Sequence, residues 1–239
     1  MDKIRTLILT GQNMHEWKRS APFCWLLLQN TGRFDVTLTT NPSETLEDAG
    51  KIKEFSLLFS DYAGPDWSPA AKENMEAFVA GGGGLALFHA ACIPFKGWKA
   101  FETMVPFLWR EEGGHGTFHE FLVTITDRDH PITRGLGDTR TTDELYHRMA
   151  HLYDNPYRVL ATAFASLAEK GTGRDEPMII VSEFGKGRVF QQMLGHVWER
   201  DPEKPDDVAL SMISLENPFF QRTLIRGCEW AATGTVTVE

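Results

Sequence analysis

Residues 81–91 read Gly-Gly-Gly-Gly-Leu-Ala-Leu-Phe-His-Ala-Ala, and this stretch decides the fold. The apolar residues 85–88 form a short continuous run, which is typical of a strand buried on both faces of a parallel sheet. The glycines before the run favour the end of a preceding helix. In open α/β sheets, ligands bind beyond the carboxyl ends of such strands. We therefore expect His89, the first residue after the run, to lie at a ligand-binding edge.

Strand patterns and helix patterns alternate through the first 105 residues, which predicts parallel strands joined by helices. The sequence therefore predicts a single α/β domain over residues 1–239, with three layers and a mainly parallel central sheet. Residues 107–150 are expected to form an elaboration over the carboxyl edge of that sheet. Strands are expected near residues 6–10, 34–38, 55–60, 85–88, 119–126, 158–164, 178–183 and 188–194, and helices near 20–32 (with Pro22 in the first turn), 68–80 and 218–232.

Composition and charge restrict the class of partner. The chain carries 24 Lys and Arg against 33 Asp and Glu, a formal net charge of −9. This balance argues against nucleic acid or an anionic membrane as partner. Apolar stretches fall far short of the roughly 20 residues that cross a bilayer, and no signal peptide is evident. Three cysteines without metal-ligand spacing predict neither a disulfide framework nor a zinc finger. We expect a cytoplasmic protein.

Polar side chains gather where predicted strands end. Since the carboxyl ends of parallel strands share one edge of a doubly wound sheet, such residues are expected to line one site. A lone histidine is more often a structural residue, but several such groups together favour a site. The residues are Asn13 and His15 after the first strand, Asp61 after the third, His89 after the fourth and His196 after the last.

Two more candidates come from the expected elaboration. His119 is in phase with apolar residues of its strand, so it is either a hydrogen-bonded core residue or a site group. Glu144, in the run Asp-Glu-Leu-Tyr at 143–146, is the nearest candidate acid. His115 and His119 have the His-x3-His spacing that suits a metal on a helix, but the surrounding glycines disfavour a helix.

Motifs spread over nearly the whole chain resemble the trehalose-utilisation (ThuA-like) family. That family has the class I glutamine-amidotransferase-like fold, which is flavodoxin-like. The motifs are residues 82–91, His-Pro-Ile-Thr-Arg-Gly-Leu at 130–136, Asp-Glu-Leu-Tyr at 143–146, Gly-Lys-Gly-Arg-Val-Phe at 185–190 with Gly-His at 195–196, and Asn-Pro-Phe-Phe-Gln at 217–221 leading to Arg-Gly-Cys-Glu-Trp-Ala at 226–231.

The amidotransferase relatives place a nucleophilic cysteine where this chain has His89, and a His-x-Glu pair after a later strand. Here Cys92 lies three residues further on, and the later pair reads His196-x-x-Glu199. Because no thiolate stands at the point of attack, we expect no glutamine hydrolysis. Cys92 is expected to be a small buried residue.

The resemblance implies a site over His89 and His196, with His119 and Glu144, that acts on a carbohydrate. One reading is an enzyme that uses the imidazoles for acid–base chemistry on a keto-disaccharide such as a trehalose derivative. Another is a zinc-dependent hydrolase in which the three histidines, with Glu144, bind the metal. Apart from such a divalent metal, the sequence indicates no cofactor.

A third reading is a non-catalytic sugar-binding or interaction module, in which Trp17, Trp109 and Trp198 matter and the histidines do not. Aromatic rings beside polar groups suit the apolar face of a sugar. The expected partner is a small-molecule carbohydrate, and a homo-oligomer is compatible with the sequence. The predicted substrate-binding residues are Asn13, His15, Trp17, Asp61 and Trp109.

Overall fold

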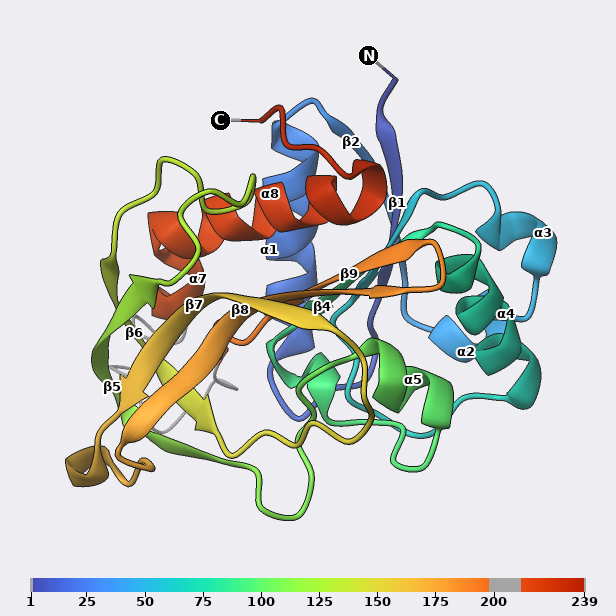
Figure 1. The fold of residues 1–239 in the computed structure, drawn as a ribbon. Coiled ribbons are helices and arrows are strands. Elements are labelled where there is room, and N and C mark those ends of the chain that lie inside the picture. Colours follow the sequence, from blue (N-terminus) through green and yellow to red (C-terminus); the bar gives the residue numbers. More distant parts are fainter. Residues whose placement is uncertain (1, 198–211, 239) are drawn as a thin grey trace.

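The computed structural model describes residues 2–197 and 212–238. Within these residues, one nine-stranded sheet runs through the molecule in the spatial order β2-β1-β3-β4-β9-β8-β7-β5-β6 (Figure 1). The strands are β1 (Ile4–Leu9), β2 (Phe34–Thr39), β3 (Leu57–Ser60), β4 (Gly84–Phe88), β5 (Gly114–Ile125), β6 (Thr139–His147), β7 (Tyr157–Ala165), β8 (Arg174–Phe184) and β9 (Gly187–Gln192).

The sheet is mixed, so the prediction of a mainly parallel sheet was wrong. Strands β2, β1, β3, β4 and β9 pair in parallel, and we call them the parallel half. Strands β8, β7, β5 and β6, the antiparallel half, pair antiparallel with one another and with β9. Parallel neighbours need a long crossover, usually a helix. Residues 114–192, which the structure describes throughout, contain no α-helix. The consecutive strands β5 and β6, β7 and β8, and β8 and β9 are antiparallel neighbours, whereas the chain passes from β6 to β7 on the other side of β5.

Two hydrophobic cores lie on the two faces of the parallel half, because successive side chains of a strand point to opposite faces. On one face, Ile8 and Phe59 pack among buried residues of α1 and α8. On the other, Leu7 and Leu58 pack among buried residues of α2, α3, α4 and α5. This half therefore has the three predicted layers. The α-helices are α1 (Trp17–Asn30), α2 (Pro42–Leu46), α3 (Ala49–Ile52), α4 (Pro69–Ala80), α5 (Lys99–Met104), α7 (Ile213–Glu216) and α8 (Pro218–Thr233).

Helix starts were predicted with mixed success. Helix α1 begins at Trp17, earlier than predicted, because Glu16 caps it, and Pro22 therefore lies inside the helix and not in its first turn. Helices α4 and α8 begin as predicted, each with a side-chain cap, Ser68 or Asn217, followed by proline. Within the described residues, no helix is long and apolar enough to cross a membrane.

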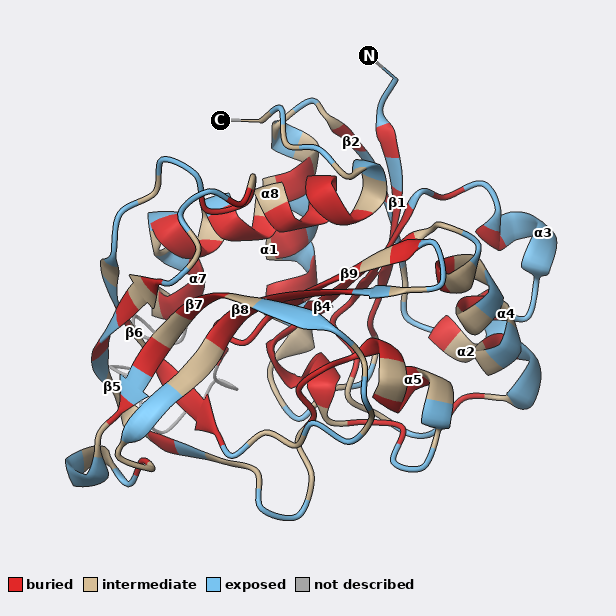
Figure 2. Ribbon diagram, viewed as in Figure 1, coloured by how far each residue is buried: buried red, intermediate tan, exposed pale blue. Residues whose placement is uncertain are grey.

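Burial differs between the halves (Figure 2). Every residue of β4 is buried, whereas in β5 the buried residues Phe121, Val123 and Ile125 alternate with exposed or half-buried ones. Strands β5 and β6 occupy much of residues 107–150, the expected elaboration, and lie at one end of the sheet. Glu144 therefore lies on a strand of the sheet itself.

Candidate functional site

His89 follows strand β4 in a strained turn into the short 3-10 helix η1 (His89–Cys92). Its φ of 45° is in the left-handed region, which costs an L-residue roughly 1–2 kcal/mol. The residue is 2 % exposed, and Nδ1 lies 2.7 Å from the carbonyl oxygen of Met193. Nδ1 therefore carries the proton and donates it to that carbonyl. The other ring nitrogen, Nε2, is buried and has no hydrogen-bond partner among the described residues.

His15 follows strand β1 on a loop that a buried carboxylate holds in place. Asp61, directly after β3, accepts hydrogen bonds from Asn13 Nδ2 at 2.9 Å and from Ser20 Oγ at 2.6 Å. The Asn13 side-chain oxygen in turn accepts the backbone N–H of His15 at 3.1 Å. Nε2 of His15 lies 3.2 Å from the hydroxyl of Tyr146. Asn13 and Asp61 therefore position His15.

His196 follows strand β9, and two acidic residues of β6 fix it. Asp143 accepts the backbone N–H groups of Gly195 at 2.7 Å and His196 at 3.1 Å. Gly195 has a φ of 124°, and a Cβ there would lie 2.2 Å from the ring of Phe88, so only glycine fits. Oε2 of Glu144 lies 2.9 Å from Nδ1 of His196. The antiparallel half thus orients a residue at the end of a parallel strand.

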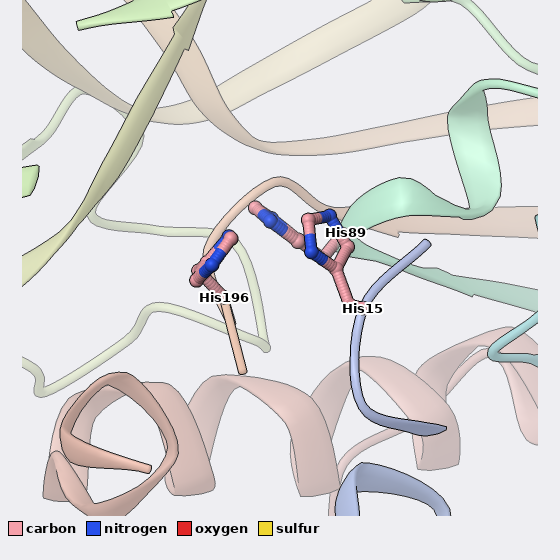
Figure 3. Close-up of side chains that lie close together, drawn as sticks. All are labelled: His15, His89 and His196. Carbon is pink, nitrogen blue, oxygen red and sulfur yellow. The ribbon is translucent and has the colours of Figure 1, made fainter. Parts of the chain in front are cut away.

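His15, His89 and His196 point toward one another from the ends of β1, β4 and β9, and we call them the histidine cluster (Figure 3). The ring of His15 lies 4.8 Å from that of His89 and 4.4 Å from that of His196, measured between centroids. One nitrogen from each of the three rings lies within 4.8 Å of the other two. The ring of Tyr146 stacks on His89 at 4.2 Å.

Burial sets the protonation states in the cluster. Burial, together with the neighbouring His196, lowers the pKa of His15 to about 4. Burial, with His15 and His196, also holds the pKa of His89 well below its usual value. Both imidazoles are therefore neutral at pH 7 and offer lone pairs rather than positive charge. Burial raises the pKa of Tyr146 well above its usual value, so its hydroxyl stays protonated.

The structure brings together three of the four predicted catalytic residues, namely His89, His196 and Glu144. His119 does not join them. Phe118, its neighbour on β5, has its ring 6.3 Å from that of His196. Since adjacent residues of a strand point to opposite faces, His119 points elsewhere, and its Nδ1 binds a carbonyl of its own strand.

The two predicted tryptophans lie near the cluster but not in it. The ring of Trp109 packs edge-on against Tyr146, with centroids 4.9 Å apart. Trp17 is half-buried and is the first residue of α1, just beyond the loop that carries His15. His15, predicted to bind substrate, is one of the three clustered imidazoles.

Tyr146 and His115 are site neighbours that the sequence reasoning missed. Residues i and i+2 of a strand share a face, so recognition of a strand over 139–147 would have placed Tyr146 beside Glu144. His115 lies opposite Tyr146 in the pairing of β5 with β6, and its Nδ1 is 3.6 Å from Oε1 of Glu144. Its glycine-rich surroundings in the sequence gave no sign of this.

Cys92 is buried inside η1, as predicted for a small structural residue. Burial raises the pKa of its thiol to about 12, so no thiolate forms at neutral pH. Trp198 and Glu199, two residues named in the sequence analysis, lie outside the described residues.

The fold and the histidine cluster define an α/β protein with a site at the ends of its parallel strands. The sequence model of the trehalose utilisation family (ThuA) matches residues 5–231, and this chain belongs to that family. The resemblance drawn from the motifs is thereby confirmed. No curated protein matches the chain.

Solved structures agree with the family assignment. A ThuA-like protein from Parabacteroides merdae is 30% identical, with a TM-score of 0.87 over 100% of this chain and 93% of that chain. A ThuA-like protein from Bacteroides uniformis is 18% identical, with a TM-score of 0.70 over 98% of this chain and 93% of that one. A cytoplasmic protein from Salmonella typhimurium shares the fold at 13% identity, with a TM-score of 0.63 over 95% of this chain and 99% of that one.

Proposed function

We propose that this chain is an enzyme of carbohydrate utilisation that acts on a keto-disaccharide, such as a keto derivative of trehalose, by acid–base chemistry. The observation that supports it most is the meeting of the histidine cluster with Glu144 and Tyr146, in a chain of the trehalose utilisation family. Neutral imidazoles, a carboxylate and a protonated phenol are the groups that proton transfer beside a carbonyl needs.

Each group has a role that its contacts support. Glu144 orients the ring of His196 through Nδ1 and stabilises the imidazolium that forms when Nε2 takes a proton from the substrate. The Tyr146 hydroxyl donates to the oxygen on which negative charge develops. Nε2 of His89, which has no hydrogen-bond partner among the described residues, accepts a hydrogen bond from a sugar hydroxyl. Trp109, beside Tyr146, offers an apolar face to the sugar ring.

Glutamine hydrolysis is not part of the proposal, because the buried thiol of Cys92 lies inside η1 and cannot serve as the nucleophile. The partner proposed is a small-molecule carbohydrate. A cytoplasmic location, which is in the name of the Salmonella typhimurium relative, belongs to the same proposal.

A panel of keto-disaccharides, each assayed beside its unoxidised parent, tests the function. We expect turnover of a keto-sugar, a loss of about 10²–10⁴ in rate in His89→Ala, and a rate within a few-fold of wild type in Cys92→Ser. Circular dichroism of each variant checks its folding. Full activity in both His89→Ala and His196→Ala would leave sugar binding without catalysis as the function. Ammonia release from glutamine that depends on Cys92 would contradict the proposal.

A further inference from the structure

We infer that the histidine cluster is a binding site for one divalent transition-metal ion, zinc above all, with His15, His89 and His196 as its ligands. This inference goes beyond the proposed function, because it concerns what the resting protein holds and not which sugar it converts. A bound ion would occupy Nε2 of His89 and of His196, so in the metal-loaded protein these two atoms could not also accept the sugar hydroxyl and the substrate proton. Metal binding and the acid–base roles proposed above for these imidazoles are therefore alternatives that the measurement of bound metal separates.

The ligand set is the first argument. Three imidazoles arrive from the ends of three different strands and bring one nitrogen each within 4.8 Å of the others. Three protein ligands with a fourth position left for water or substrate are typical of catalytic zinc. Nitrogen donors suit zinc, copper, nickel or iron, whereas magnesium and calcium take oxygen. The chemistry of the set therefore selects a transition metal.

His89 supplies the second, independent argument. Its Nε2 is buried, lies in the cluster and has no hydrogen-bond partner among the described residues. Leaving such a buried polar atom unsatisfied is unfavourable. The positive φ of His89 adds backbone strain at the same residue. A cation bound to Nε2 would give this buried atom the partner that it lacks among the described residues.

Two of the three rings, those of His89 and His196, have the outer contacts of metal-binding histidines. A ligating histidine almost always donates its other ring N–H to a carbonyl or a carboxylate. Nδ1 of His89 meets the carbonyl of Met193 at 2.7 Å, and Nδ1 of His196 meets Glu144 at 2.9 Å. Both contacts leave Nε2 as the metal-binding nitrogen. Glu144 and Asp143 also place negative charge near the cation.

Zinc binding requires the three nitrogen atoms of the cluster to move closer together. Two nitrogens on one tetrahedral zinc lie about 3.4 Å apart, since each Zn–N bond is about 2.0–2.1 Å. Separations of up to 4.8 Å in the cluster must therefore shorten by up to about 1.4 Å. His15 is half-buried on a loop, whereas His89 and His196 are buried and fixed by the contacts above. His15 is the ligand that closes the site, and it takes the place that the sequence analysis gave to His119.

Metal binding to the full-length, tag-free protein tests the inference. After dialysis against a chelator, the protein is titrated with Zn²⁺ and with Co²⁺, whose visible absorption reports tetrahedral nitrogen coordination. We expect one equivalent to bind, and His15→Ala, His89→Ala and His196→Ala each to weaken binding at least about 100-fold. Glu144→Gln, which removes an outer contact, should weaken it about 10- to 100-fold. The exposed His151→Ala is the matched control and should keep wild-type affinity.

Two results would overturn the inference: wild-type protein that takes up no Zn²⁺, or uptake that is unchanged in all three ligand variants. Circular dichroism checks that each variant is folded. If His89→Ala does not fold, His15→Ala decides, because its side chain lies on a half-buried loop. The readout is bound metal and not sugar turnover, so the metal site and the proposed function can fail separately.

Discussion

The two halves of the sheet are built on different principles. In the parallel half, helices cover both faces, and strands such as β4 are buried throughout. In the antiparallel half, burial alternates, and Leu122, Tyr157 and Phe164 are exposed although they lie within strands. The parallel half supplies the three imidazoles from its strand ends, and the antiparallel half supplies Glu144 and Tyr146.

This difference shows why the site lies where the halves meet. The strand ends of the parallel half place the three imidazoles on turns and loops, where Met193 and Asn13 already contact His89 and His15. A strand of the antiparallel half then passes beside those ends and fixes them. Asp143 holds the backbone at His196, Glu144 holds its ring, and Tyr146 contacts both His15 and His89.

The largest effect is expected where the halves touch. Glu144→Gln removes the charge that orients and stabilises His196, and we expect turnover of the keto-sugar to fall by about 10²–10⁴. Glu120→Gln is the matched control, since Glu120 is an exposed residue of the neighbouring strand β5 that pairs with Arg140. Steady-state kinetics on both variants test the comparison. Equal rates in the two would mean that the antiparallel half only supports the fold.

A matched pair of leucines tests the difference in burial. Leu85 in β4 is fully buried, whereas Leu122 in β5 is 44% exposed. We expect Leu85→Ala to lower the free energy of unfolding by about 2–5 kcal/mol and Leu122→Ala to change it by less than about 0.5 kcal/mol. Urea denaturation measures both. Similar losses would show that another surface covers β5 in solution.

The difference between the parallel and antiparallel halves also explains which parts of the fold and of the site could be predicted from the sequence. Continuous apolar runs and helix patterns identified the strands of the parallel half and its three longest helices, α1, α4 and α8, and with them the positions of His89 and His196. The short helices α2, α3 and α5 were not predicted. The two-residue connection at Gly185 and Lys186 is compatible only with an antiparallel pairing of β8 and β9. The connections before β6, β7 and β8 are longer, and their local sequence does not determine the direction of the next strand.

No strand was predicted over 139–147. The sequence therefore placed Glu144 near the site but gave no sign that Tyr146 lies on the same face of a strand. His119 was predicted at the site from its burial phase, but burial phase alone does not tell which face of β5 meets the strand ends.

Two aspartates, one from each half, predict a pH dependence of stability. Burial raises the pKa of Asp61 from its usual 3.8 to about 7, although hydrogen bonds from Ser20 and Asn13 act to lower it. At a pH between 3.8 and about 7, Asp61 is protonated in the folded protein but ionised in the unfolded chain. The free energy of unfolding therefore falls as pH rises through this window, by at most about 1.4 kcal/mol per pH unit for this group.

Asp61→Asn should reduce that slope between pH 5 and 7, as measured by urea unfolding at several pH values. Asp138→Asn is the control from the antiparallel half. A hydrogen bond from the backbone N–H of Ile125 lowers the pKa of Asp138, so its contribution is lost only as pH falls below the usual aspartate range. A slope in Asp61→Asn equal to that of wild type would show that the carboxyl is ionised in the folded protein.

The smallest effect is expected at His119, the histidine that the face of β5 separates from the cluster. Its Nδ1 binds the carbonyl of Thr117, and its ring packs on Phe121, so the substitution His119→Ala removes contacts within one strand only. We expect its affinity for Zn²⁺ to stay within a few-fold of wild type, whereas His15→Ala loses the metal. Calorimetric titration of both variants compares the two histidines directly. Loss of the metal in His119→Ala with retention in His15→Ala would mean that β5 turns its other face to the strand ends, and that the ligand set predicted from the sequence is the correct one.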